Sequence, residues 1–363
     1  MTGRYVRYRD DVEVLRPDED RTALDIVAAM RRIAETGLDH YRHAVRPSHA
    51  KSHGALRGTL KVLAGLEEPL AQGLFATPRT YAVVARLAPV PGDLLADDVT
   101  VQRGMALKVI GVEGPMLPGH EGEVTQDFLL DNGSRFPVPD AEAFLATLRG
   151  LEKTTDRVEP LKRAVAVAAR GANAALKTVG LDSANLDFLG HPPVHPLADT
   201  YYSQAPIRWG DYIAKVAVAP TPETLAALQD RPFDPNAGFS ALRDAVVAFF
   251  RDRGAAYEFR AQLCTDLERM PVEDASVEWS EEESPYRPVA LLTFPRQEAY
   301  GPARRVHVDD LLSFCPAHSL AAHRPLGSLM RARLKAYEPS ARWRAEMNAR
   351  PCVEPKSIDE IPD

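Results

Sequence analysis

The spacing of apolar residues along the chain changes from three or four to two near residue 54. Over residues 21–37, apolar side chains recur at helical spacing and Gly37 closes the pattern, so we expect a helix there. From residue 54 onward, apolar and polar side chains alternate, as Leu60 and Val62 do around Lys61, which indicates a half-buried strand. The same alternation predicts further strands at 80–87, 105–111, 125–131, 210–219, 257–263, 275–279 and 288–294.

These strands form two groups, over residues 54–131 and 210–294, separated by a mostly helical insertion at 140–185. Helices are expected at 140–151, 160–179, 240–253 and 327–344. Alternating strands flanked by turns suggest an α+β fold built on a closed antiparallel barrel, because closure removes exposed sheet edges. Periodicity alone does not distinguish a barrel from a sandwich. We expect residues 1–350 to form a single domain and the acidic, proline-bearing tail 351–363 to be a surface extension.

Composition excludes several classes of function. The 363 residues suffice for one large domain or two, with an ordinary 45% hydrophobic and 26% charged content. The formal net charge of -7 argues against a nucleic-acid-binding protein, which usually carries a basic face. No apolar stretch reaches the roughly 20 residues that span a membrane, and the N-terminus lacks a secretory signal. Because Cys264, Cys315 and Cys352 form neither a disulfide framework nor a metal motif, we expect a cytoplasmic protein.

One candidate site lies in the predicted C-terminal helix. Arg333 precedes Tyr337 by four residues, so on a helix the two side chains share one face. A nearby guanidinium favours the charged phenolate, which is a hard anionic ligand suited to ferric iron, and tyrosine can hold haem iron from the proximal side. Arg344, two turns further on, could meet a carboxylate such as a haem propionate. The alternative is a basic amphipathic helix in which Tyr337 packs and the arginines are solvated.

A second segment, near the N-terminus, strengthens the haem interpretation. Residues 46–55 read RPSHAKSHGA, which resembles the distal-histidine segment of the haem catalases, where an arginine stands three residues before the histidine. The sequence RLKAY that ends at Tyr337, followed by an arginine seven residues later, is similar to the proximal segment of the same family. The resemblance implies that Tyr337 is the axial ligand of a haem, expected to be haem b, and that 327–344 is the proximal haem helix.

Two weaker similarities lie between these segments, in the order that the family shows. Residues 81–86 read YAVVAR and resemble the strand that supplies another propionate-binding arginine, here Arg86. Residues 103–108 and 127–132 resemble a further strand and the segment that bears the distal asparagine. The resemblance covers about residues 40–350 and is closest to the short catalase-related proteins. It implies an eight-stranded antiparallel β-barrel with surrounding helices and a haem pocket against the barrel wall.

The resemblance also implies a role for each candidate residue. His49 is expected to take the first proton from a peroxide and to return it to the leaving oxygen, because imidazole exchanges protons near neutrality. Arg333 keeps the phenolate charged. Three arginines would pair with the haem propionates, whose carboxylates match the fork of a guanidinium: Arg46, Arg86 and Arg344.

Two assignments stay open at this point. Asn132 is expected to hydrogen-bond the peroxide, but Asp131 can be aligned with the same position, and the sequence around them is also typical of a turn. His49 and His53 are four residues apart and could bind a non-haem metal if they lay on a helix. The strand predicted from residue 54 argues against that metal site.

Departures from the family pattern bear on the reaction. Catalases carry a serine two residues after the arginine that corresponds to Arg86, whereas this chain has Ala88, and Ser48 replaces an apolar residue before the histidine. We therefore expect a haem peroxidase that reduces hydrogen peroxide or organic hydroperoxides with an organic reductant. The alternatives are a true catalase, an enzyme that rearranges fatty-acid hydroperoxides, and a non-enzymatic haem-binding protein. We expect neither a nucleic-acid partner nor a membrane span, and leave assembly into a homo-oligomer open.

Overall fold

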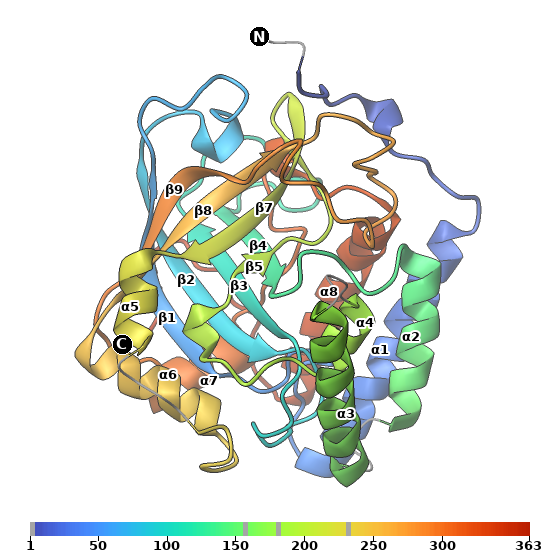
Figure 1. The fold of residues 1–363 in the computed structure, drawn as a ribbon, viewed down its shortest axis with the longest axis vertical. Helices are drawn as coiled ribbons and strands as arrows, with labels where there is room; N and C mark the ends of the chain where they lie inside the picture. Colours follow the sequence, from blue (N-terminus) through green and yellow to red (C-terminus); the bar gives the residue numbers. More distant parts are fainter. Residues whose placement is uncertain (1–3, 155–158, 179–182, 230–233) are drawn as a thin grey trace.

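The computed structural model describes residues 4–154, 159–178, 183–229 and 234–363. Within these ranges, the strands form one sheet and the helices gather around it (Figure 1). The strands are β1 (Gly54–Val62), β2 (Thr80–Pro89), β3 (Arg103–Ile110), β4 (Thr125–Asp131), β5 (Tyr201–Tyr202), β6 (Ile207–Trp209), β7 (Tyr212–Pro220), β8 (Ala255–Leu263) and β9 (Arg287–Phe294). The α-helices are α1 (Glu19–Tyr41), α2 (Ala141–Thr154), α3 (Glu159–Lys177), α4 (Ala184–Leu189), α5 (Pro222–Gln229), α6 (Ala241–Asp252), α7 (Pro302–Val306) and α8 (Ser328–Met347).

Eight strands close into an antiparallel barrel. Neighbouring strands follow the order β5-β4-β3-β2-β1-β9-β8-β7, and β5 also pairs with β7, which completes the ring. The closing strand is only two residues long: Tyr202 lies opposite Asp131 of β4, and Tyr201 lies opposite Val218 of β7. The short strand β6 pairs with β7 beside this closure. The predicted α+β fold with an eight-stranded antiparallel β-barrel and surrounding helices is confirmed.

The inside of the barrel is a packed apolar core. In β3, for example, Met105, Leu107 and Val109 belong to this core, as the alternation predicts. Three aromatic rings add to the filling, because Phe75 stacks on Trp209 with ring centroids 4.7 Å apart and on Phe259 at 5.2 Å. Side chains therefore fill the interior of the barrel, and the cavity described below lies on its outer face.

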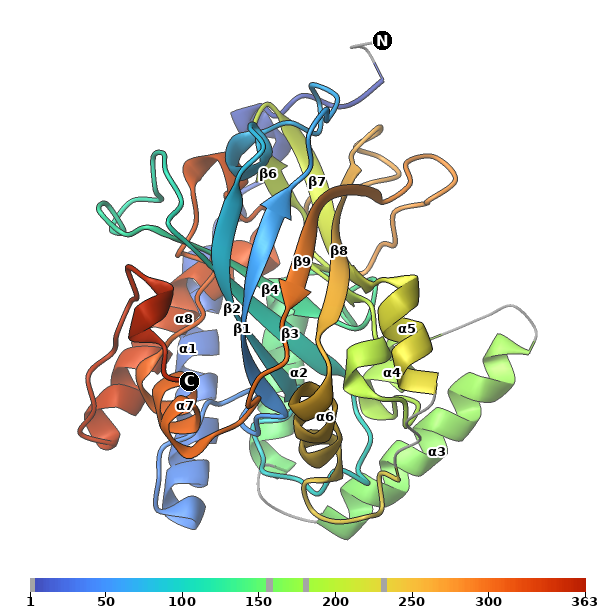
Figure 2. The same cartoon turned by 90° about the vertical axis from the view of Figure 1, so that its left-hand side faces the viewer.

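A second apolar core forms where three helices meet beside the barrel. The first helix begins and ends beyond the predicted range 21–37 and packs against α2 and α8 through small and branched side chains. Figures 1 and 2 both place α1 beside α8, outside the sheet. The buried residues of this helical core are Ala23, Ile26, Ala29, Met30, Ile33, Ala141, Leu145, Leu148, Ala332 and Ala336. These contacts fix α8 relative to the barrel.

The last helix continues past a proline. Pro339 lies inside α8, where it supplies no backbone N–H to the helix. The helix nevertheless extends to Met347, because buried side chains on both sides of the proline, such as Ala336 and Trp343, anchor the two halves. Arg344 is therefore held two turns beyond Tyr337 on one continuous helix.

Residues 275–279, predicted to be a strand, are irregular instead, so that prediction was wrong. Asp274 accepts hydrogen bonds from the backbone N–H and the hydroxyl of Ser276, at 2.9 and 2.6 Å, and this bends the chain. The carbonyl of Val277 accepts from Lys215 Nζ, and that of Trp279 accepts from Gln262 Nε2, so side chains replace a partner strand. The eighth barrel strand is β5, which is too short to show alternation.

The tail 351–363 lies against the barrel. Val353 forms a parallel bridge with Leu312, and Ile361 is 1% exposed in a small apolar core outside β1, β2 and β3. Glu354 reaches the buried ammonium of Lys108 at 2.5 Å. These contacts fasten the tail over the outer face of the sheet.

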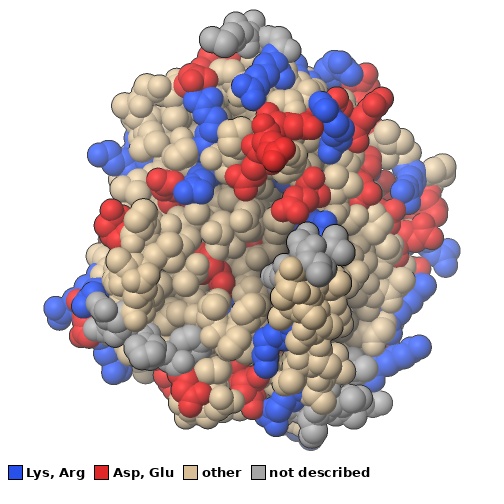
Figure 3. All heavy atoms as spheres, viewed as in Figure 1, with Lys and Arg blue, Asp and Glu red and all other residues tan. Residues whose placement is uncertain are grey.

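Charge is mixed over the surface seen in Figure 3. Lysine, arginine, aspartate and glutamate side chains are intermixed on that face, and none of the charges there forms a large area of one sign. Across the described part of the chain, every helix is too short or too polar to cross a lipid bilayer.

Candidate active site

A cavity of about 510 Å³ lies between the outer face of the barrel and α8. On the barrel side, β2 and β3 present small residues, Ala88, Gly104 and Ala106, which leave room that larger side chains would fill. Six of the residues predicted from the sequence line this cavity: Arg46, His49, Arg86, Arg333, Tyr337 and Arg344. The fold thus brings together residues that lie almost three hundred positions apart.

Tyr337 and Arg333 form the α8 side of the cavity. One turn of helix separates them, and Arg333 donates a hydrogen bond from Nη2 to the Tyr337 hydroxyl oxygen at 2.8 Å. The guanidinium carbon also lies 5.2 Å from the centroid of the phenol ring. The spacing expected from the sequence is therefore present in the structure.

His49 lies on the barrel side. Its backbone has a φ of 53°, a left-handed conformation, and its N–H donates to the Val90 carbonyl at 2.8 Å. The ring makes a further hydrogen bond to the backbone of Ala88, and burial, together with the positive charges of Arg86 and Arg333, lowers the pKa of His49 to about 3. The imidazole is consequently neutral at physiological pH and able to accept a proton.

Gly104 makes room for this ring. A Cβ at that position would lie 2.8 Å from Cε1 and 3.1 Å from Nδ1 of His49. Both contacts are too short for carbon, and the backbone oxygen of Leu130 would lie at 3.1 Å on another side. The absence of a side chain at residue 104 therefore sets where the His49 ring can lie.

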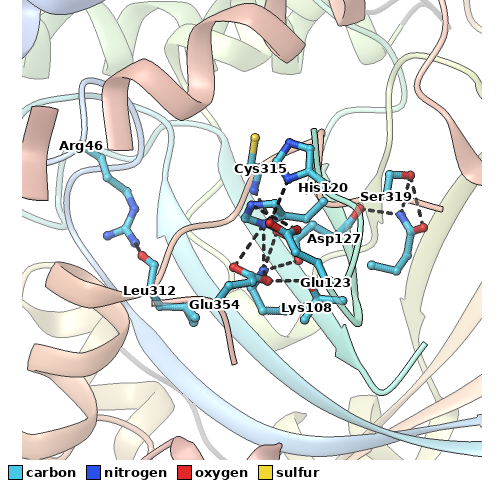
Figure 4. Close-up of polar contacts among 12 residues, drawn as sticks. Arg46, Lys108, His120, Glu123, Asp127, Leu312, Cys315, Ser319 and Glu354 are labelled. Atoms are coloured by element: carbon cyan, nitrogen blue, oxygen red, sulfur yellow. Dashed lines mark hydrogen bonds and ion pairs between the residues drawn. The ribbon is translucent and has the colours of Figure 1, made fainter. Parts of the chain in front are cut away.

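Three arginines gather at one end of the cavity. Arg46 donates to the carbonyls of Val308 at 2.8 Å and Leu312 at 3.0 Å, and Figure 4 shows it reaching toward Leu312. Arg344 donates from Nη2 to the same Leu312 carbonyl at 3.1 Å, whereas its Nε is buried and makes no hydrogen bond to the described residues. Burial is the main cause that lowers the pKa of Arg46, and repulsion from Arg344 and Arg86 adds to it.

The main carboxylate among these arginines is Asp309, which the sequence did not identify. Arg86 donates from Nε to Asp309 Oδ1 at 3.0 Å, and Tyr300 donates its hydroxyl to Oδ2 at 2.8 Å. Burial alone would raise the pKa of Asp309, but Arg86 and Arg46 outweigh it and lower the pKa. No motif marks Asp309, because its arginine partners come from segments more than two hundred residues earlier in the chain.

The two candidates for the distal amide position, Asp131 and Asn132, have different surroundings in the structure. Asp131 lines the cavity, whereas Asn132 does not. The Asn132 amide nitrogen contacts Asp199 and His191, both at 3.1 Å, and its oxygen accepts from the backbone N–H of Arg103 at 3.0 Å. Asn132 thus fastens the end of β4 to the segment before β5. Two amide side chains that the sequence did not single out do line the cavity, Gln102 and Gln204.

His49 and His53 are not placed to share a metal ion. His53 is 1% exposed and contacts Asp97 through Nε2 at 3.2 Å. The same carboxylate binds the Lys51 ammonium at 2.7 Å, so a cation already occupies it. Histidine, cysteine and acidic side chains that come together closely enough for a metal ion lie elsewhere in the described part of the chain.

The residues of the cavity fit a haem. Its volume is within the range of small-molecule and cofactor sites, and its walls are mostly apolar. The phenol oxygen of Tyr337 supplies a ligand of the type that binds ferric iron. Arg46, Arg86 and Arg344 carry three positive charges, whereas two carboxylates, Asp309 and Asp310, act on this group, so the arginines keep an excess of positive charge that suits a ligand with carboxylates. The unpartnered Nε of Arg344 is one donor available to such a ligand.

No protein-family model matches the sequence, and no curated protein matches it. Solved structures with a similar fold include a fungal catalase and catalase A from Saccharomyces cerevisiae, both with a TM-score of 0.57 and 17% sequence identity, over 90% and 85% of this chain. A bacterial catalase is similar over 88% of the chain, with a TM-score of 0.54 and 16% identity. The chain spans 63–68% of the length of these three proteins. The comparison establishes a catalase-like fold.

Proposed function

We propose that this protein is a haem-dependent peroxidase that reduces hydrogen peroxide or organic hydroperoxides, with a small organic molecule as the electron donor. The observation that carries the proposal is the arrangement of Tyr337, its partner Arg333 and a neutral His49 around one cavity. The proposed partners are thus a peroxide and a reductant.

Each of the cavity side chains has a distinct role in this proposal. Tyr337 would ligate the haem iron, Arg333 would hold the phenolate in its charged form, and Arg46, Arg86 and Arg344 would pair with the propionates. The bound haem would supply the redox chemistry that peroxide reduction needs. His49 would accept a proton from the peroxide and return it to the departing oxygen, while its hydrogen bond to Ala88 keeps the ring oriented.

Two features favour a peroxidase over a fast catalase. The His49 ring has a hydrogen bond to the backbone of Ala88, and residue 88 offers it no side-chain hydroxyl. The cavity also extends along apolar side chains of the helices, which suit an organic hydroperoxide or donor. The helical residues on this side include Phe144 and Leu148 of α2 and Val165 of α3, and Val99, Val101 and Leu129 add apolar side chains from outside the helices.

The test is the reaction of the haem-loaded protein with hydrogen peroxide and with an alkyl hydroperoxide, in the presence of a phenolic donor. We expect donor oxidation with slow oxygen release. Replacement of His49 by Ala should lower the donor oxidation rate by about 10²–10⁴-fold with an unchanged haem spectrum, because general acid–base catalysis is worth that much. The control is His40→Ala, at an exposed position of α1. Rapid oxygen release without donor oxidation would indicate a catalase, and an unchanged rate in the His49 variant would contradict the role of this residue.

A further inference from the structure

We propose that His120, Glu123 and His318 form a binding site for a divalent transition metal, best suited to zinc, on the outer face of the barrel. His120 and Glu123 come from the loop between β3 and β4, and His318 comes from the segment between η4 (His307–Leu311) and α8. None of the three residues lines the cavity of the proposed haem site. The proposal is therefore independent of haem binding.

The three side chains already converge. One possible ligand atom from each lies within 4.8 Å of the other two. His120 Nδ1 is 3.0 Å from Glu123 Oε1, and His318 Nε2 is 3.9 Å from Glu123 Oε2. The two imidazole rings are 5.2 Å apart at an interplanar angle of 71°. Two histidines and one carboxylate are a common ligand set for zinc, and small side-chain rotations would bring the three atoms to the ~2.0–2.2 Å that zinc requires.

The carboxylate of Glu123 has an unused acceptor. Its Oε2 atom is buried and makes no hydrogen bond to any described residue, and His318 Nε2 lies 3.9 Å from it. A buried carboxylate oxygen normally has a partner, because an unsatisfied one costs free energy. A metal ion between Glu123 and His318 would supply that partner.

The charges behind the site are also unbalanced. Figure 4 shows Asp127 and Glu354 at the ammonium of Lys108, and Glu123 beside this group. Lys108 is 2.8 Å from Asp127 and 2.5 Å from Glu354, and all of these groups are buried or half-buried. With Glu123, which contacts His318, the cluster holds three carboxylates and one ammonium, so its carboxylates outnumber its lysine cation by two. A divalent cation would restore neutrality.

Asp127 is placed to orient the ligand His318. Its Oδ2 lies 3.0 Å from His318 Nδ1, which is also 3.1 Å from Lys108 Nζ. In the tautomer that donates from Nδ1 to the Asp127 carboxylate, Nε2 keeps a lone pair that faces Glu123. A carboxylate behind a histidine ligand is the usual way to fix the tautomer and raise the basicity of the ring. Asp127 also accepts a hydrogen bond from the backbone N–H of Cys315 at 2.8 Å, which holds the segment that carries His318.

The metal would join three parts of the chain. It would link the β3–β4 loop to the segment of His318, and through Lys108 and Glu354 it would reinforce the attachment of the C-terminal tail. Three protein ligands leave a fourth position for water. A metal at this position would increase the stability of the folded protein, because it binds the native arrangement only.

The experiment is a titration of the purified, chelator-treated protein with Zn²⁺ by calorimetry, together with thermal unfolding in the presence and absence of Zn²⁺. We expect one equivalent of Zn²⁺ to bind and the unfolding temperature to rise. His120→Ala and Glu123→Gln should each weaken binding by at least about 10²-fold, because each removes a ligand. Glu121→Gln, an exposed carboxylate in the same loop, is the matched control and should bind normally.

His120 and Glu123 lie at the rim of the cluster, so these variants should fold, and circular dichroism without metal verifies it. Absence of saturable binding to the unmodified protein would overturn the proposal. So would binding that persists unchanged in both ligand variants, because the metal would then lie elsewhere. We expect Zn²⁺ to leave the haem spectrum unchanged, so failure of zinc binding can be distinguished from failure of the proposed peroxidase activity.

Discussion

At the scale of single residues, Tyr337 and His49 are held in different ways. Tyr337 depends on its own helix, since Arg333 one turn away donates directly to the phenol oxygen. His49 depends on other segments: the Val90 carbonyl holds its backbone, Ala88 holds its ring, and Gly104 of β3 leaves the space that the ring occupies. The histidine is therefore more sensitive to changes at distant positions of the sequence.

Gly104→Ala tests how narrowly the His49 ring is positioned. The added methyl would lie 2.8 Å from the ring, and the backbone oxygen of Leu130 limits any movement of the strand away from it. We expect the rate of peroxide reduction to fall by about 10²-fold, because a displacement near 1 Å at a reacting group costs that much. Haem absorbance should remain, which separates the effect from loss of the cofactor. An unchanged rate would show that the ring position is not constrained by residue 104.

The pH dependence of the reaction follows from the buried imidazole. Burial and the neighbouring arginines lower the pKa of His49 to about 3, so the neutral form that accepts a proton persists well below the ordinary pKa of 6.5. We expect the rate of peroxide reduction to stay nearly constant from pH 8 to pH 5 and to decline only as the pH approaches 3. Stopped-flow measurements across this range give the profile. Loss of half the rate near pH 6.5 would mean that His49 titrates like an exposed histidine.

The site was predictable at this scale only where its contacts are local or where a motif marks them. The pairing of Arg333 with Tyr337 follows from a four-residue spacing on one helix, and His49 stands in a recognisable segment. Asp309 carries no such mark, since its partners Arg46 and Arg86 are brought to it by the fold. Likewise, only the direction of the chain at the end of β4 decides that Asp131 lines the cavity and Asn132 does not.

At the scale of elements, α8 carries the proposed ligand and must be fixed in place. Arg331, near its start, contacts Glu19 at 2.5 Å, Glu13 at 2.6 Å and Glu273 at 2.9 Å. The three carboxylates come from the start of α1, the N-terminal segment and the loop after β8. Burial alone would lower the pKa of Arg331, but its hydrogen bonds to these three carboxylates raise it. One guanidinium thus ties α8 to three other segments.

Replacement of Arg331 by Met should lower the free energy of unfolding by about 3 kcal/mol, because it removes the cation that three largely buried carboxylates share, although Arg324 still pairs with Glu13. Arg342→Gln removes an exposed arginine of the same helix that pairs with Glu338, and should change the free energy by less than about 0.5 kcal/mol. Chemical denaturation of the two variants measures both values. Equal and small effects would show that the Arg331 network does not contribute to stability.

The strands differ in how well the sequence pattern predicts them. The long strands have clear alternation, so β1, β2, β3, β4, β7, β8 and β9 lie close to their predicted ranges. By contrast, β5 has two residues, and it is defined only by its partners Asp131 and Val218. Residues 275–279 contain apolar side chains at strand spacing, but hydrogen bonds to the side chains of Lys215 and Gln262 replace strand pairing there.

At the scale of the whole molecule, the fold is similar to that of catalases although only 16–17% of aligned residues are identical. The closed barrel provides a rigid outer wall, and α8 lies across it with the cavity between them. Periodicity predicted the two groups of strands. Barrel closure depends on contacts between residues distant in sequence, so the closed eight-stranded barrel was predicted from the family resemblance. From its composition, the tail 351–363 was expected to be a surface extension, whereas its acidic residue Glu354 forms an ion pair with the buried Lys108.

The central claim is that the cavity holds a haem through Tyr337. The direct measurement is a titration of the purified protein with hemin, followed in the Soret region, for the unmodified chain and for Tyr337→Phe. The phenylalanine keeps the ring and removes only the oxygen that would bind iron. We expect saturation at one haem per chain with a distinct Soret band, and a loss of affinity or a shifted band in the variant. Saturable binding with an identical spectrum in both proteins would contradict the claim, because the iron ligand would then lie elsewhere.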